Sequence, residues 1–147
     1  MPDPQEHILR RAYGSRRVSE TRRAIARVAA GLPGAFSVEQ LREETARTVP
    51  GVGLATAYRA VNAMLDSGYL ASVGTRDGTA LYAVCAGGAH HHHLVCTTCG
   101  AVTGVACPLD SGLASTAELA GYTLTSHEIT LYGVCRACLG RTSEGVD

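Results

Sequence analysis

Two C-x2-C pairs constrain this chain more than any other feature of its sequence. They are Cys96-Thr-Thr-Cys99 and Cys135-Arg-Ala-Cys138, and 35 residues separate them. A C-x2-C turn points two thiolates at one ion, and two such turns form the tetrahedral sulfur cage that suits zinc. Because the spacing exceeds that of a minimal zinc ribbon, a helix and strands should lie between the pairs. The pattern predicts a structural zinc; four buried thiols or a redox pair are the alternatives.

Composition and charge indicate a folded chain with two functions. The 147 residues are 46% hydrophobic and 18% charged, enough to bury a core. Residues 1–84 carry 11 Arg and 8 acids, whereas residues 85–147 carry 2 Arg, 5 acids, all six Cys and five of the six His. A basic half followed by an acidic, metal-ligand-rich half suggests separate DNA-binding and metal-binding roles.

The start of the chain and its cysteines bear on its location. The first residues lack the apolar stretch of a signal peptide, and no apolar run approaches the ~20 residues of a membrane helix. We therefore expect a cytoplasmic protein that does not span a membrane. In that compartment, six cysteines point to metal binding before disulfides.

The first half contains helix signals followed by a hairpin signal. We expect a short helix at 4–13 and then helices between Ser19 and Gly31, between Ser37 and Pro50, and at about 54–66. The apolar face of the last helix is marked by Leu54, Tyr58, Val61, Met64 and Leu65. Asp77-Gly78 then joins two apolar runs, as in a β-hairpin. Three helices followed by a two-stranded wing are typical of a winged helix-turn-helix.

The second half predicts a small α/β unit. Short strands should flank the first cysteine pair, a helix should run from near Pro108 to Gly121, a strand should cover 122–135, and the tail from Gly140 should be loose. We therefore predict an α+β fold, with a winged-helix domain at 1–84, a metal-binding domain at 85–147 and a hinge at about 85–89. Because the second unit is too short to bury a good core alone, we expect it to be a dimerisation domain that a second copy completes.

The run His90–His93 is the second metal signal. On a strand, alternate side chains face opposite sides, so His91 and His93 would face one way and His90 and His92 the other. The run could therefore supply two metal sites, because imidazole suits zinc, nickel, copper and iron. Solvent-exposed histidines without a ligand role are the alternative.

The two remaining cysteines have different prospects. Cys85 precedes the histidine run by a hinge-length gap and could join the His91/His93 face, or it could be a small core residue. Cys107 has no evident partner in the sequence, and we interpret it as structural.

These motifs together resemble a known family. The segment GLATAYRAVNAMLDSGYL, Cys85, HHHHLVCTTCG, the His127-Glu-Ile segment and the final C-x2-C, in this order, resemble the ferric uptake regulator family over about residues 15–138. Cys85 with the histidine tract, and Phe36 where many iron sensors of the family have His, most resemble its zinc uptake regulator branch.

The resemblance implies a homodimeric, metal-dependent repressor that binds inverted-repeat sites in double-stranded DNA. It implies structural zinc at Cys96, Cys99, Cys135 and Cys138, a hinge sensor site at Cys85, His91 and His93, and a dimerisation-domain site at His90, His92, Asp110 and His127. An N-cap role is the alternative for Asp110. Ala71 departs from the pattern, because the zinc branch often has an acidic fourth hinge ligand there.

The same resemblance places the DNA contacts on the 54–66 helix. Thr56, Tyr58 and Arg59 are the expected readers of the major groove. The alternative places Tyr58 in the core and Arg59 on a solvated face. Phosphate contacts are expected from Arg16, Arg17, Arg22 and Arg23, although any surface Arg cluster would look the same.

The favoured function is a zinc-responsive repressor, not an enzyme. Within the family, a sensor of nickel, manganese, iron or peroxide is the alternative. A zinc hydrolase or deaminase needs an acid–base group such as the Glu of H-x-E, whereas His127 and Glu128 are adjacent. Neither an enzyme nor a passive zinc buffer explains the recognition helix.

Overall fold

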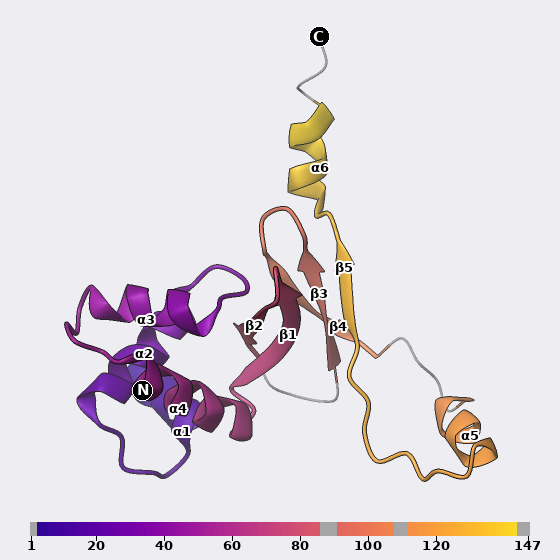
Figure 1. The fold of residues 1–147 in the computed structure, drawn as a ribbon, viewed down its shortest axis with the longest axis horizontal. Coiled ribbons are helices and arrows are strands. Elements are labelled where there is room, and N and C mark those ends of the chain that lie inside the picture. The colour runs from indigo at the N-terminus through magenta and orange to yellow at the C-terminus, as the bar shows by residue number, and fades with distance from the viewer. Residues whose placement is uncertain (1–2, 86–90, 108–111, 144–147) are drawn as a thin grey trace.

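The computed structural model describes residues 3–85, 91–107 and 112–143, and it begins with a cluster of helices (Figure 1). The helices are α1 (Pro4–Tyr13), α2 (Glu20–Gly31), α3 (Val38–Ala46) and α4 (Leu54–Asp66). Their starts follow the expected capping signals. Ser19 accepts the backbone N–H of Arg22, and Ser37 and Gln40 form a reciprocal capping box.

Helix α4 buries a narrower face than the sequence predicts. Ala57, Ala60 and Met64 are fully buried in the helical core. Leu54 and Tyr58, which the sequence interpretation placed on that face, are 41% and 43% exposed. Small alanines let α4 pack closely, so its first turns project away from the core.

Two small sheets follow the helices. Strands β1 (Leu70–Arg76) and β2 (Thr79–Val84) form the predicted antiparallel wing, in which Asp77 and Gly78 take the positive φ values that the tight turn needs. Strands β3 (His91–Cys96), β4 (Val102–Ala106) and β5 (Thr130–Gly133) form the second sheet in the order β4-β3-β5. The β3–β4 pair is antiparallel and the β3–β5 pair is parallel.

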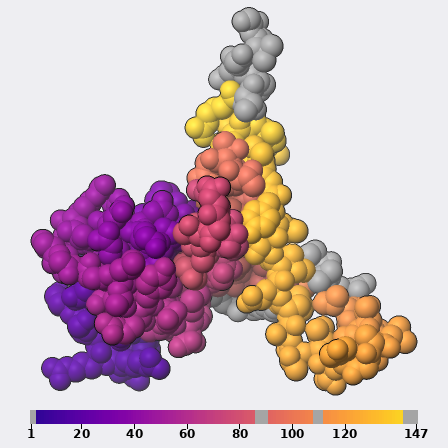
Figure 2. Space-filling model, in the orientation of Figure 1, coloured from indigo at the N-terminus to yellow at the C-terminus, as the bar shows by residue number. Residues whose placement is uncertain are grey.

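The wing packs directly against the second sheet. Val73, Leu81 and Ala83 of the wing share a buried cluster with Val95 of β3. Figure 2 shows the wing seated against the later strands rather than standing apart from them. The segments on either side of the predicted hinge therefore share apolar contacts.

The second cysteine pair continues into α6 (Arg136–Ser143). The carbonyl of Cys135 accepts the backbone N–H groups of Cys138 and Leu139, so the C-x2-C turn is also the first turn of the helix. The prediction of a loose tail from Gly140 is therefore wrong as far as Ser143, because the helix that starts at the C-x2-C turn continues to that residue.

The region between the cysteine pairs also departs from the sequence pattern. The predicted strand over 122–135 forms only as β5, since β3 is its one strand partner among the described residues. Helix α5 (Gly112–Leu119) lies within the predicted helix, whose first residues, 108–111, fall outside the described residues. Figure 1 shows α5 standing away from both sheets.

None of the helices in the described ranges is both long and apolar enough to cross a bilayer.

Candidate metal centres and nucleic-acid interface

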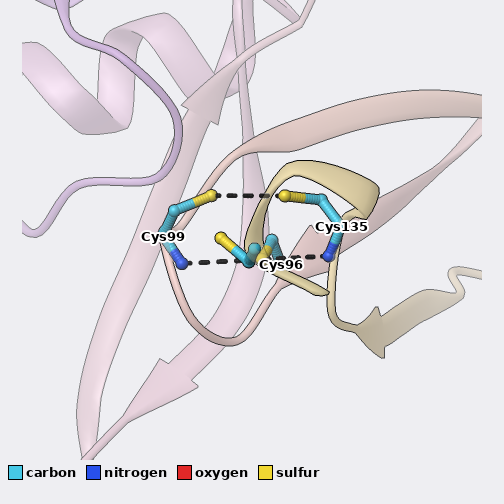
Figure 3. Close-up of side chains that lie close together, drawn as sticks. Cys96, Cys99 and Cys135 are labelled. Carbon is cyan, nitrogen blue, oxygen red and sulfur yellow. Dashed lines mark hydrogen bonds between the residues drawn. The ribbon is translucent and has the colours of Figure 1, made fainter. Parts of the chain in front are cut away.

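Four cysteines meet where β3 ends and α6 begins. The Sγ atoms of Cys96, Cys99, Cys135 and Cys138 lie within 4.8 Å of one another. Figure 3 shows Cys96, Cys99 and Cys135 converging, with 3.8 Å between the sulfurs of Cys99 and Cys135. Zinc–sulfur bonds of about 2.3 Å at tetrahedral angles place two sulfurs about 3.8 Å apart, so the four thiols fit zinc.

The backbone around this cluster stabilises negative charge on sulfur. The N–H groups of Cys99 and Cys135 point at the Cys96 sulfur from 3.5 and 3.3 Å, and these bonds, Cys135 first, lower the pKa of Cys96 to about 5. In contrast, hydrogen bonding with the Cys135 side chain raises the pKa of Cys138. Neighbouring thiolates repel one another, so the four thiols do not all lose their protons easily. A bound divalent cation offsets this repulsion.

A second cluster joins the end of β2 to β3. The Cys85 sulfur lies 3.0 Å from Nε2 of His91, and the three ligand atoms of Cys85, His91 and His93 lie within 4.8 Å of one another. Burial lowers the pKa of His93, and the neighbouring His91 and His92 add to the effect. The neutral imidazole that results is the form that binds metals.

The backbone of Cys85 is held from two sides. Its N–H donates to the carbonyl of Tyr69 at 2.8 Å, and its own carbonyl accepts from Nη2 of Arg11 at 2.8 Å. The Arg11 guanidinium also lies over the Tyr69 ring, 5.6 Å from its centroid. Helix α1 and the start of β1 thus fix the position of this candidate ligand. Ala71 lies nearby along β1, paired with Ala83 of β2.

A third cluster lies on the opposite face of β3. His92 is buried, and its ring centroid is 5.0 Å from that of His127. The Cys107 sulfur lies 3.3 Å from Nε2 of His127. His90 and Asp110, the other predicted members of this site, lie outside the described residues. Cys107 is the residue that sequence reasoning missed.

The antiparallel register offered a signal for Cys107. His92 lies opposite Val105, and His91 lies opposite Ala106. Side chains two residues apart share a face of a strand, so Cys107 follows Val105 onto the His92 face. Without the register, the sequence alone could not place it there.

The predicted DNA-reading residues lie in the N-terminal half of α4. Tyr58 and Arg59 are exposed and Thr56 is half-buried, so the alternative that places Tyr58 in the core is wrong. The Tyr58 hydroxyl lies 3.4 Å from a carboxylate oxygen of Glu39 on α3. The negative charge of Glu39 raises the pKa of Tyr58.

The predicted phosphate-binding arginines surround α1 and α2. Arg16, Arg17 and Arg23 line a groove of about 590 Å³ beside α1. Arg23 also lies 3.9 Å from Glu20. Arg22 is half-buried, and its carbonyl accepts the Tyr13 hydroxyl.

The comparison with known proteins fits this geometry. The sequence profile described as "Ferric uptake regulator family" matches residues 14–132. The chain belongs to the ferric uptake regulator family. The zinc uptake regulation protein of Mycobacterium tuberculosis is 32% identical over 125 residues, which is 83% of this chain and 94% of that protein.

Other relatives extend the comparison. The ferric uptake regulation protein of Bacillus subtilis is 33% identical over 98 residues, or 65% of this chain and 66% of that protein. The solved structure of a zinc uptake regulator in complex with zinc and DNA shares the fold, with a TM-score of 0.78 at 22% identity, covering 96% of this chain and 99% of that one.

Membership confirms several of the sequence predictions. Proteins of this family are transcriptional regulators that bind DNA as dimers, so this chain is a regulator and not an enzyme. The predicted α+β fold, with a winged helix followed by a small α/β dimerisation unit, is that of the solved relatives.

Proposed function

We propose that this chain is a zinc-responsive repressor that binds inverted-repeat operators as a homodimer in the cytoplasm. Relatives named for zinc and for iron are about equally identical to it, at 32% and 33%, so the donor atoms must decide the metal. The observation that carries the proposal is the cluster of Cys85, His91 and His93. Sulfur and imidazole donors favour zinc over iron or manganese, which prefer more oxygen ligands.

The structural role belongs to the four-cysteine cluster. Cys96 and Cys99 lie at the end of β3, and Cys135 and Cys138 lie where α6 begins, so zinc there would join the turn after β3 to the last helix. We assign residues 1–84 to DNA binding and 85–147 to metal binding and dimerisation. The second site that the family resemblance implies, at His90, His92, Asp110 and His127, would tune the response from within the second unit.

The hinge cluster provides the switch. Cys85 ends the wing and is tied to α1 and β1, whereas His91 and His93 belong to β3. Zinc supplies a bond between these two segments. When the three side chains hold zinc, they therefore restrict the orientation of the winged helix. Two recognition helices bind an operator only at one spacing, so this restriction favours DNA binding, with a coupling of typically ~1–3 kcal/mol.

The DNA-facing residues match this role. Exposed Tyr58 and Arg59, with Thr56, would enter the major groove at the start of α4. The arginines beside α1 and α2 would contact the phosphates and make binding dependent on salt; they are Arg16, Arg17, Arg22 and Arg23.

The second unit leaves apolar side chains for a partner copy. Among the described residues, α5 contains no buried residue, and Leu119 is 91% exposed. Tyr122, Leu131 and Leu139 are also exposed. A second copy of this unit would cover these side chains in a two-fold dimer.

Operator binding tests the switch. Fluorescence anisotropy would follow binding to operator DNA as the apo-protein is titrated separately with zinc, nickel, manganese and iron. We expect zinc to give the tightest complex. Cys85→Ala should lose zinc-dependent binding while keeping its structural zinc, whereas Thr103→Ala, an exposed change on β4, should behave as wild type. Equal operator affinity of apo and zinc-loaded protein would overturn the proposal.

A further inference from the structure

We propose that Cys107 is a metal ligand, which joins His92 and His127 in the dimerisation-domain site and lets that site bind zinc through nitrogen and sulfur donors. The inference rests on the proposed function only in naming zinc as the ion. It assigns Cys107 a role that the sequence pattern did not give it. It also places a sulfur donor in a site for which the family resemblance implies only nitrogen and oxygen donors.

The geometry supports coordination. The ligand atoms of the three residues lie within 4.8 Å of one another. Metal–nitrogen and metal–sulfur bonds of about 2.0 and 2.3 Å place a sulfur and a nitrogen ligand of tetrahedral zinc about 3.5 Å apart. The Cys107 sulfur and Nε2 of His127 lie 3.3 Å apart, close to that separation.

The surroundings of Cys107 do not match those of a packing residue. Cys107 is half-buried, and neither hydrophobic cluster of the described chain includes it. Its sulfur points at an imidazole instead. A cysteine that serves only to fill a core contacts apolar side chains, so its position here favours a chemical role.

The backbone contacts the His92 ring at one of its two nitrogens. The N–H of Ile129 points at its Nδ1 from 3.1 Å, which makes Nε2 the candidate ligand atom. A neutral ring that accepts at Nδ1 carries its proton on Nε2. Metal binding at Nε2 therefore moves that proton to Nδ1 and turns the Ile129 N–H away.

The donor set determines which ion the cluster should prefer. A thiolate carries the same single negative charge as a carboxylate, so the charge of the loaded site is unchanged when sulfur replaces oxygen. The softer sulfur shifts preference toward zinc and away from iron or manganese. Both metal sites on β3 would then contain one thiolate and at least two imidazoles.

The site also has a structural consequence for α5. Cys107 precedes this helix in the chain, and His127 follows it. Figure 1 shows α5 standing away from the second sheet. A metal bound by His92, Cys107 and His127 would link the chain before α5 to the chain after it. It would thereby restrict the helix whose side chains are exposed in the single chain.

Cobalt titration of the full chain tests the assignment. Apo-protein would be loaded with Co²⁺ under reducing, oxygen-free conditions, and thiolate-to-cobalt charge-transfer absorption would be followed in the near ultraviolet. We expect three equivalents per chain, one for each cluster, and two for Cys107→Ser, with loss of the corresponding absorption. The matched control is Ala106→Ser, an exposed neighbour, which should keep all three equivalents.

A further variant separates the sulfur from the site. Cys107→His should keep three equivalents and lose only the charge-transfer absorption that Cys107 contributes. If Cys107→Ser binds three equivalents with unchanged absorption, or if the wild type binds only two, the proposal is wrong. Either result would mean that Cys107 and His127 form only a thiol–imidazole hydrogen bond.

A measurement on the wild type covers the case in which the variants do not fold. Zinc should slow alkylation of Cys107, read by mass spectrometry of its peptide, and an unchanged rate would refute the assignment. Failure here is distinct from failure of the proposed function. Zinc-dependent operator binding depends on Cys85, whereas these readouts report Cys107 alone.

Discussion

Alanine at Gly34 should destabilise the protein more than alanine at another glycine with the same backbone conformation. Gly34 has a φ of +78° and lies against the cysteine turn, where a Cβ would overlap the carbonyl oxygen of Gly100. The next residue, Ala35, donates its N–H to that carbonyl at 3.0 Å. This is the point where the helical cluster meets the turn that contains Cys96 and Cys99.

The expected magnitude follows from two contributions. An L-residue in the left-handed region costs about 1 kcal/mol or more. Relief of the overlap requires two backbones to separate, which breaks the bond between Ala35 and Gly100 and costs about 0.5–1.5 kcal/mol. Together these give about 1.5–2.5 kcal/mol for Gly34→Ala. Gly68 has a φ of +75°, and an added Cβ there would have no described atom within 4 Å, so Gly68→Ala should cost only about 1 kcal/mol.

Urea denaturation of the zinc-loaded proteins, followed by circular dichroism, would measure both values. Gly68→Ala serves as the matched control because it reports the backbone strain without the contact. The difference between the two variants isolates the contact between the helical cluster and the cysteine turn. Equal destabilisation would refute the reasoning, since it would show that this contact contributes nothing in solution.

Other changes test separate parts of the molecule. Cys96→Ser should unfold the C-terminal half and release its zinc, and a folded, metal-free dimer by circular dichroism and sizing would contradict this. Arg11→Met removes the donor to the Cys85 carbonyl, so zinc affinity at the hinge should fall about 2- to 10-fold in a chelator competition, and an unchanged affinity would exclude a positioning role. Ala71→Asp should raise that affinity if an acidic ligand is missing; no increase would show that three protein ligands suffice. Tyr58→Ala should weaken operator binding and leave the dimer mass unchanged by light scattering; an altered mass would mean a structural role instead.

Local signals explain which parts of the fold the sequence could predict. The caps at Ser19 and Ser37 and the Asp77-Gly78 turn act over a few residues, so helix starts and the wing were predicted at their observed positions. The cysteine pairs were equally readable, because a short fixed spacing defines each turn. In these segments, propensity and tertiary contacts favour the same structure.

Features that depend on distant partners could not be predicted in the same way. The exposure of Tyr58 depends on how closely the alanines of α4 approach the other helices. The place of Cys107 depends on the β3–β4 register, and the short length of β5 depends on which strands lie beside it. The contact between Gly34 and Gly100 joins segments that no local pattern relates.

The contacts of the wing show why a modest metal-binding energy could be enough to operate the proposed switch. A body attached at one point can still rotate, and the hinge cluster at Cys85 is one point. Residues 1–84 already contact the later part of the chain elsewhere, where Ala35 donates to Gly100, where the Tyr132 hydroxyl donates to the carbonyl of Val73 at 3.2 Å, and where the wing packs on Val95. These contacts already limit how residues 1–84 can turn, so the hinge ligands need to add little further restriction. A coupling within the ~1–3 kcal/mol typical of coupled sites would therefore be enough for the hinge ligands to favour the DNA-binding arrangement.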